Sequence, residues 1–198
     1  MKNLFPGIWE WSWFSEEKQL DFNGHYLAVG EHRILIDPPP LSSPDLAFLT
    51  QGDQIDYILL TNRDHQREAA QLKQDFGCRI MAPEADAKEM TVPIDKTFKD
   101  GELLPGGIWV IHLLHQKSPG ESALFLQKGK GILIVGDALI GDPPGSFRLL
   151  PDEKYAEKTQ ARLSLKRLLN FSFDTVLVGD GASVLTNAKT AVHTLLES

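Results

Sequence analysis

The sequence has little of what marks secreted, membrane-spanning or disulfide-bonded proteins. Its single cysteine, Cys78, excludes an internal disulfide and a Cys-x-x-Cys zinc knuckle, and such sparing use is typical of a reducing compartment. The opening segment MKNLFPGIWEW lacks the apolar stretch of a signal peptide. The longest apolar run, Ile132–Val135, is far too short to cross a bilayer. We therefore expect a cytoplasmic protein without a membrane partner.

Positive charge is also in short supply. The chain has 20 Lys and Arg against 27 Asp and Glu, a net charge of −7 and a pI near 5.3. Nucleic acids and anionic membranes favour basic protein surfaces, so we expect neither as a partner. The chain also contains neither Gly-x-x-x-x-Gly-Lys-Ser/Thr nor Gly-x-Ser-x-Gly. These absences argue against P-loop nucleotide hydrolysis and serine-esterase chemistry.

The 198 residues, 42 % of them hydrophobic and 24 % charged, suit one globular domain spanning residues 1–198. Apolar runs predict strands at residues 8–14, 25–29, 33–36, 56–60, 79–82, 109–114, 122–127, 131–135 and 175–178. Helical spacing predicts helices at residues 43–50, 66–76, 153–169 and 186–196, with a helical turn at 83–87. This mixture of hairpins with strand–helix units favours an α/β sandwich over a purely parallel sheet.

Polar residues directly follow four of the predicted strands. One strand leads into residues 61–67 (TNRDHQR), and another into His112 and His115. A third leads into Gly136-Asp137 and a fourth into Gly179-Asp180-Gly181. Strand ends are where α/β proteins place their functional sites, and an aspartate there is either a turn residue or a ligand. Whether the four ends converge is a question for the tertiary structure.

These elements and strand ends together resemble the metallo-β-lactamase superfamily. The resemblance covers nearly the whole chain and begins at the hairpin FNGHYLAVGEHRILIDPP. It implies a four-layer αββα sandwich in which a buried strand is followed by the motif Thr-His-x-His-x-Asp-His. Further segments of that family contribute a His before a Pro-Gly-Ser-like turn, a metal-bridging Asp in a Gly-Asp pair, and a His in Gly-His-Gly.

The match to the family's first motif is partial. Thr61 stands at the motif's threonine, while Asn62 and Asp64 take the first two His positions. Gln66 takes the Asp position and Arg67 the third His position, which leaves Arg63 and His65 at the variable positions. A shifted alignment, kept as an alternative, sets Asp64-His65 on the motif's Asp-His pair and loses the match at the threonine.

The remaining segments extend the implied site. His115 lies in HQKSPGES, the segment similar to the family's second, although it is farther from Pro119-Gly120 than is usual. Asp137 retains the bridging aspartate, and Asp180 stands where the family has His. The resemblance thus implies a metal set of Asn62, Asp64, His115, Asp137 and Asp180, of which Asp64 and His115 would be catalytic.

An oxygen-rich set of this kind would hold at most one weakly bound divalent cation. Such ligands favour hard ions over Zn²⁺, so Mn, Mg, Zn or Fe, or no metal at all, remain open. Arg67 stays protonated and cannot ligate a cation. It would instead bind the carboxylate of Asp137 or Asp180 in a bidentate manner. With Arg63 and Gln66 it would then replace the positive charge of the missing metal ion.

Three functional hypotheses follow. The first is a metal-dependent hydrolase of this superfamily with an eroded metal centre, in which one ion activates water. The second is a non-catalytic protein that binds a small, anionic molecule or a partner protein, with Arg67 replacing the metal charge. The third is a metal-free acid/base enzyme that uses His115 and a carboxylate. A homodimer through the strand that carries Trp9, Trp11 and Trp13 is a further expectation.

Simpler interpretations stand beside these. Asn62 and Asp64 are both suited to cap the following helix, and we expect one of them to do so. We expect His65 to be a solvated residue of the first helical turn, His25 to lie at the surface, and Cys78 to be buried and inert.

Overall fold

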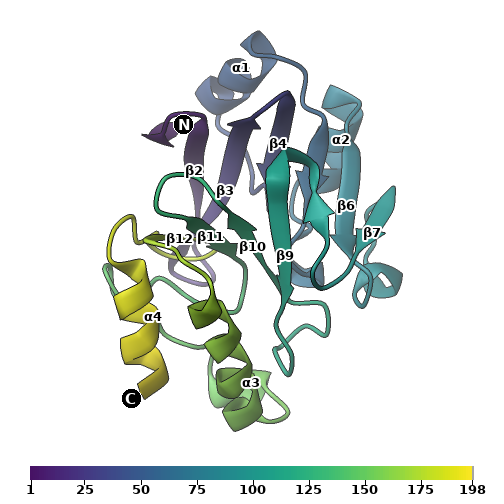
Figure 1. Ribbon diagram of the computed structural model, residues 1–198. Helices are drawn as coiled ribbons and strands as arrows, with labels where there is room; N and C mark the ends of the chain where they lie inside the picture. The colour runs from purple at the N-terminus through teal and green to yellow at the C-terminus, as the bar shows by residue number, and fades with distance from the viewer. Residues whose placement is uncertain (198) are drawn as a thin grey trace.

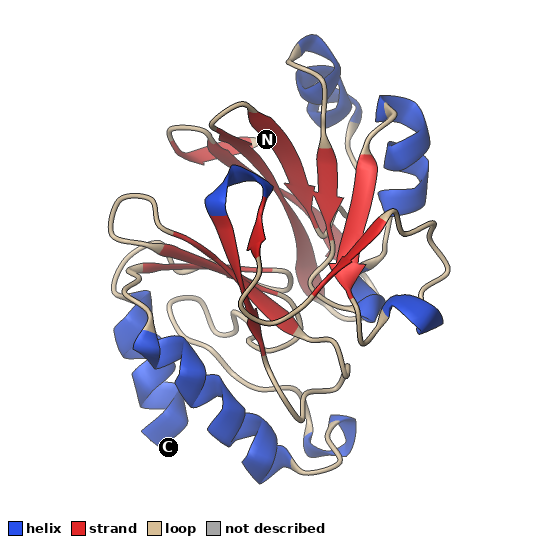
Figure 2. Cartoon of the chain, turned by 45° about the vertical axis from the view of Figure 1, so that its right-hand side comes forward, coloured by secondary structure: helices blue, strands red, loops and turns tan. Residues whose placement is uncertain are grey.

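Two β-sheets lie face to face, and helices cover their outer surfaces (Figures 1 and 2). The computed structural model describes residues 1–197. The first sheet is flanked by α1 (Ser43–Gln51) and α2 (Ala69–Phe76), and the second by α3 (Lys158–Leu165) and α4 (Ala188–Glu197). The architecture is the four-layer αββα sandwich that the sequence predicts.

The first sheet has seven strands in sequential order. They are β1 (Lys2–Phe5), β2 (Ile8–Ser15), β3 (Leu20–Val29), β4 (His32–Ile36), β5 (Tyr57–Leu59), β6 (Arg79–Pro83) and β7 (Lys96–Phe98). The first four are joined antiparallel, whereas β4 to β7 run parallel. Because α1 and α2 form the crossovers between β4, β5 and β6, the carboxyl ends of these three strands share one edge of the sheet.

The second sheet has five strands in the order β12-β11-β10-β9-β8. They are β8 (Leu103–Leu104), β9 (Ile108–His112), β10 (Ser122–Leu126), β11 (Ile132–Val135) and β12 (Thr175–Val178). Only β11 and β12 are parallel, paired so that Val135 lies opposite Val178. The Gly-Asp pairs that follow these two strands therefore emerge next to each other.

Three apolar layers hold the sandwich together. Between the sheets, residues such as Leu27, Ile36 and Leu59 of the first pack against Leu124 and Ile134 of the second. A second cluster lies under α1 and α2, and a third lies between the second sheet and α3 and α4. Since each sheet is covered on both faces, its central strands carry apolar side chains at consecutive positions and not only at every second one.

Several predicted boundaries are wrong. The helix expected at 153–169 is divided into the short 3₁₀ turn η4 (Asp152–Lys154), α3, and η5 (Lys166–Asn170), and α4 begins two residues after the predicted start. The expected helix at 66–76 begins at Ala69, because η1 (Arg63–His65) and a turn precede it. Strands β1, β7 and β8 are too short to give a periodic signal. The turn at 83–87 contains 3₁₀ helix only from Ala87, as η2 (Ala87–Glu89).

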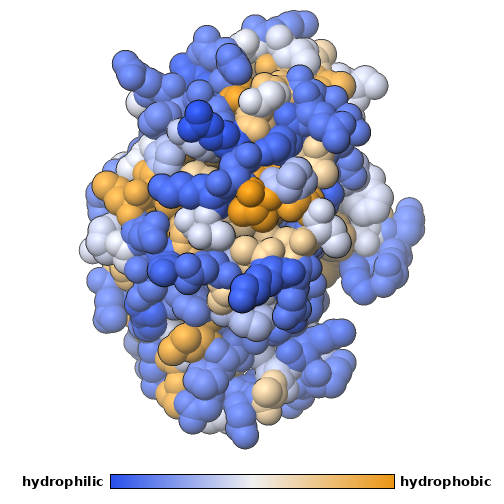
Figure 3. Space-filling model, turned by 90° about the vertical axis from the view of Figure 1, so that its right-hand side faces the viewer, coloured by the Kyte–Doolittle hydropathy of each residue, from blue (hydrophilic) through white to orange (hydrophobic). Residues whose placement is uncertain are grey.

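The surface is mostly hydrophilic where Figure 3 shows it, with apolar side chains in small separate patches. Trp11 is buried and Trp13 is 42 % exposed, so the tryptophans of β2 do not share one environment. A homodimer through this strand stays a prediction. Within the described residues, none of the helices is both long and apolar enough to span a membrane.

Candidate functional site

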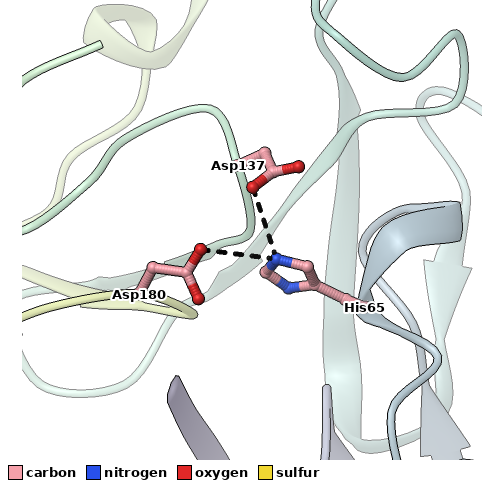
Figure 4. Close-up of side chains that lie close together, drawn as sticks. All are labelled: His65, Asp137 and Asp180. Atoms are coloured by element: carbon pink, nitrogen blue, oxygen red, sulfur yellow. Dashed lines mark ion pairs between the residues drawn. The ribbon is translucent and has the colours of Figure 1, made fainter. Parts of the chain in front are cut away.

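The carboxyl ends of strands from both sheets meet over one buried histidine, His65. Asp37 follows β4, His65 belongs to η1 after β5, and Asp137 and Asp180 follow β11 and β12. Figure 4 shows the imidazole of His65 pointing between the carboxylates of Asp137 and Asp180. The strand ends singled out in the sequence therefore converge, although the segment that follows β9 reaches the site through Lys117 and not through His112 or His115.

His65 contacts a carboxylate on each side of its ring. Nδ1 lies 2.9 Å from Oδ2 of Asp37, and Nε2 lies 3.6 Å from Oδ1 of Asp137 and 3.9 Å from Oδ2 of Asp180. The side chain is 3 % exposed. The expectation of a solvated His65 is therefore wrong, because the turn after β5 directs this side chain inward between the two sheets. The expectation of a surface His25 is wrong as well, since that residue is fully buried on β3.

The carboxylates keep His65 protonated. Burial and the charge of Arg67 both lower the pKa of His65, but Asp37 and Asp137 outweigh them and raise it to about 10. Burial raises the pKa of Asp37, yet the charges of His65 and Arg67 hold it below its usual value. The pKa of Asp137 is lowered in the same way, by His65 and then by Lys117 against the effect of burial. The centre of the site is thus a network of ion pairs.

Two glycines make the approach of His65 to the second sheet sterically feasible. A Cβ at Gly179 would lie 2.4 Å from Cε1 of His65, and one at Gly136 would lie 2.3 Å from Oγ1 of Thr61. Real Cβ contacts are essentially never this short. The Gly-Asp pairs after β11 and β12 therefore have two roles: the glycine admits the neighbouring loop, and the aspartate faces His65.

Arg67 binds the carboxylate of Asp180 and lies beside His65, with Nη2 of Arg67 3.5 Å from Nε2 of the imidazole. Its Nη2 donates to Oδ1 of Asp180 at 2.6 Å and to the carbonyl of Gly179 at 3.2 Å. Its Nη1 donates to the carbonyls of Asn23 and Asp37, and the guanidinium lies 4.6 Å from the ring centre of Phe22. The side chain is only 9 % exposed. A cation held by this many partners ties the first sheet to the second.

Lys117 neutralises the other aspartate. Its Nζ lies 2.8 Å from Oδ2 of Asp137 and 3.0 Å from Oδ2 of Asp64. Burial lowers the pKa of Lys117, but Asp137 and Asp64 together raise it above its usual value. The ammonium therefore stays charged between the two carboxylates.

Asn62 and Glu121 are fully buried next to the site and hydrogen-bond to each other. Asn62 caps η1, with its amide oxygen accepting from the backbone N–H groups of Asp64 and His65, and its amide nitrogen donates to Glu121 at 2.8 Å. Burial, followed by the charge of Asp137, raises the pKa of Glu121 well above its usual value. The expected cap is thus Asn62. All the polar atoms of its side chain are committed within the fold, which turns them away from the pocket.

The other residues singled out in the sequence are placed apart from His65. Arg63 pairs with Glu89, and the side chain of Gln66 holds the backbone at Arg63, Thr91 and Val92. His115 is exposed, with a left-handed φ of 60°, in the turn between β9 and β10. The chain reverses there, and Lys117 rather than His115 reaches the aspartates. His115 does not line the pocket over His65.

Above these charges lies a pocket of about 510 Å³. Its lining includes a connected cluster of three cations and three carboxylates, called the floor: His65, Arg67, Lys117, Asp64, Asp137 and Asp180. Apolar side chains line its walls: Leu20, Phe22, Ile140, Leu150 and Pro151. Three further lining cations have exposed side chains and are called the mouth cations: Lys18 (58 % exposed), Arg148 (41 % exposed) and Lys154. Concave sites of this volume with apolar walls and a few convergent polar groups are typical of small-molecule sites.

Sequence reasoning missed two of the residues that matter most here. Asp37 reads as the stop of a strand before Pro38-Pro39-Pro40, and nothing local indicates that its side chain reaches His65. Lys117 had a usable signal, because it lies two residues before Pro119 and so nearer than His115 to the Pro-Gly turn. The parallel register of β11 and β12 was also readable in outline, from two apolar runs that both end in Gly-Asp.

The distances alone would let a metal ion lie among His65, Asp137 and Asp180. One ligand atom from each lies within 4.8 Å of the others. The chemistry of the set fits such an ion poorly. Asp137 is bound to Lys117, Asp180 is bound to Arg67, and the surrounding carboxylates hold the pKa of His65 above its usual value. A histidine must be deprotonated at its ligating nitrogen to bind a metal.

The chain belongs to the metallo-beta-lactamase superfamily, whose sequence profile matches residues 1–198. A metallo-beta-lactamase from Pontibacter korlensis is 17 % identical with a TM-score of 0.76, covering 100 % of this chain and 98 % of that one. A metallo-beta-lactamase family protein of Thermus thermophilus, TTHA1429, is 16 % identical with a TM-score of 0.72 and coverages of 98 % and 80 %.

A third similar structure, TTHA1623 in a di-iron-bound form, is 26 % identical with a TM-score of 0.71, covering 87 % of this chain and 93 % of that one. A search of curated protein sequences found no match to the chain. The fold and the family of the chain are therefore established.

Proposed function

We propose that this chain is a metal-independent member of its superfamily that binds a small anionic molecule in the pocket above His65. The observation that supports it is the pairing of the two buried aspartates with the chain's own cations. Lys117 lies 2.8 Å from Asp137, and Arg67 lies 2.6 Å from Asp180. In this proposal the lysine and the arginine supply the positive charge that metal ions supply elsewhere in the superfamily.

Energetics favour the organic cations over an ion. A metal entering between Asp137 and Asp180 would have to displace Arg67, whose side chain is 9 % exposed, and leave its guanidinium without a carboxylate. An uncompensated buried charge costs about 3–5 kcal/mol. His65 would also have to lose a proton against its raised pKa of about 10. A metal would need to offset both costs with a small, oxygen-rich ligand set.

The charge of the pocket supports an anionic ligand. Six lining side chains are positive and three are carboxylates, which gives the lining a net charge of +3 when His65 is protonated. The whole chain has a net charge of −7. The lining therefore presents more cationic than anionic side chains to a ligand, which favours an anion at the site.

A metal-dependent hydrolase is the second candidate. Superfamily membership and the clustering of His65, Asp137 and Asp180 favour it, and one similar structure was solved in a di-iron-bound form. In that case these three residues would hold the ion, which would activate water. The geometry does not favour an acid/base enzyme that uses His115, because His115 is exposed and lies outside the pocket lining.

Metal content separates the two candidates. Protein purified without chelator is analysed by elemental mass spectrometry, beside the Arg67→Ala and Lys117→Met variants. The proposal expects far less than one equivalent of Mn, Zn or Fe in the unmodified protein, and divalent-ion uptake in at least one variant because its aspartate is freed. About one equivalent in the unmodified protein would overturn the proposal in favour of the hydrolase. Lys117→Met keeps the apolar stem of a side chain that is 31 % exposed, so it guards against an Arg67→Ala variant that fails to fold.

A further inference from the structure

The positive charges of the pocket differ in how far they are already neutralised. On the floor, three cations face three carboxylates of the lining, and Arg67 and Lys117 each contact an aspartate directly. Within the described residues, none of the mouth cations forms an ion pair with a carboxylate of the lining. The lining cations that are not matched by a lining carboxylate are therefore these three.

The mouth cations also keep free donors. Lys18 pairs with Glu17, in an ion pair of two exposed side chains that contributes little. Arg148 donates from Nε to the carboxylate of Asp142, and within residues 1–197 neither of its Nη groups donates a hydrogen bond. Lys154 pairs with no carboxylate in the described part of the chain and is exposed. An anion arriving from solvent meets these donors first.

Between mouth and floor the walls are apolar. Leu20 and Phe22 alternate along β3, so both face the pocket, and Lys18 continues the same side at the hairpin turn. On the other side, Leu150 and Pro151 lie in the segment that also carries Arg148 and Lys154. Each wall therefore combines apolar side chains with exposed cations.

We propose that the ligand is an amphipathic anion, an apolar body that carries one phosphate or carboxylate group, bound with its anionic group at the mouth and its apolar body between the walls. This inference rests on the proposed function, since it takes the floor to be filled by the chain's own cations. An anionic group on the floor would lie against Asp64, Asp137 and Asp180, which are already paired. At the mouth it meets Lys154 and the Nη groups of Arg148, and a guanidinium binds phosphate or carboxylate in a bidentate manner.

The test is isothermal titration of the full chain with four small probes: n-hexyl phosphate, n-hexanoate, n-hexanol and inorganic phosphate. We expect hexyl phosphate or hexanoate to bind, with inorganic phosphate and hexanol each weaker by about tenfold or more because each lacks half of the recognised chemistry. The first two probes distinguish a phosphate ligand from a carboxylate ligand. If neither amphipathic probe binds, or if inorganic phosphate binds as tightly, the inference is refuted.

Variants locate the anionic group. Lys154→Ala is expected to weaken binding of the amphipathic probe about tenfold, the effect of losing a charged hydrogen-bond donor. Lys130→Ala is the matched control: it also removes one lysine charge from an exposed turn, but at the hairpin between β10 and β11. An equal effect of the two variants would overturn the inference, as would a loss with Lys117→Met but not with Lys154→Ala, because the anion would then bind at the floor.

Metal content measured on the same preparation keeps the two proposals distinguishable. A metal-free protein that binds no amphipathic anion overturns only the ligand assignment. One equivalent of bound metal overturns the proposed function, whatever the titration gives.

Discussion

The ion pair between Asp37 and His65 allows the sharpest test of how this site is held together. Asp37 is 1 % exposed, receives Nδ1–H of His65 at 2.9 Å and receives the backbone N–H of Thr61 at 2.8 Å. Asp37→Asn removes the charge and keeps the shape of the side chain. The residue has φ 46°, a left-handed conformation that asparagine tolerates better than most residues, so the change tests charge rather than backbone strain.

The expected loss is large because the partner stays buried. Removing one member of a buried ion pair costs about 3–5 kcal/mol, since His65 is then left protonated beside a neutral amide, or must lose its proton. The matched control is Asp53→Asn, which breaks a 2.6 Å ion pair with Arg33 on the surface, where Asp53 is 71 % exposed. An exposed pair contributes about 0.2–1 kcal/mol.

Urea denaturation followed by tryptophan fluorescence at pH 7 measures both variants, with equal m values required for the comparison. The melting temperature of Asp37→Asn should fall by roughly 6–20 °C, at about 2–4 °C per kcal/mol for a chain of this size.

The folded pKa of Asp37 lies below its ordinary 3.8, so its charge contributes stability above that pH, and this contribution is lost as the pH falls through the folded value. The difference in the free energy of unfolding between the wild type and Asp37→Asn should therefore become smaller at acid pH. A loss at pH 7 no larger than that of Asp53→Asn would refute the account of a buried ion-pair network.

Other predictions concern local packing and the single thiol. Gly136→Ala should cost more than about 2 kcal/mol in urea denaturation, because its Cβ would overlap Thr61, while Gly52→Ala should be neutral or slightly stabilising, since its nearest contact would be 3.5 Å and its φ is −84°. Equal effects of these two variants would contradict the steric argument. Burial raises the pKa of Cys78 to about 11, so at pH 8 a disulfide reagent should modify the native thiol about a hundredfold more slowly than the urea-unfolded one. Similar rates in both states would show that Cys78 is accessible.

Residue patterns within the sequence determined much of the fold. Apolar runs such as 131–135 and 175–178 identify buried strands because they are short, consecutive and bounded by glycine, and the helix that ends at Gly77 follows from local spacing and capping. The Gly-Asp pairs at 136–137 and 179–180 mark strand ends for the same reason: the change from apolar to polar is local. The resemblance to the superfamily then supplied the layer arrangement, which no single segment contains.

Which polar side chains meet depends on contacts between segments that are distant in the sequence. Asp37 and His65 are 28 residues apart, and their contact depends on the parallel register of β4 with β5 and on the inward direction of one turn. Lys117 reaches Asp137, and His115 does not, because the chain reverses between β9 and β10 with His115 in a left-handed conformation. Side-chain direction at such turns is set by backbone angles and long-range packing. Neither can be predicted from the type and spacing of the residues. The sequence therefore determined where polar groups gather, and the fold determined which charges neutralise one another.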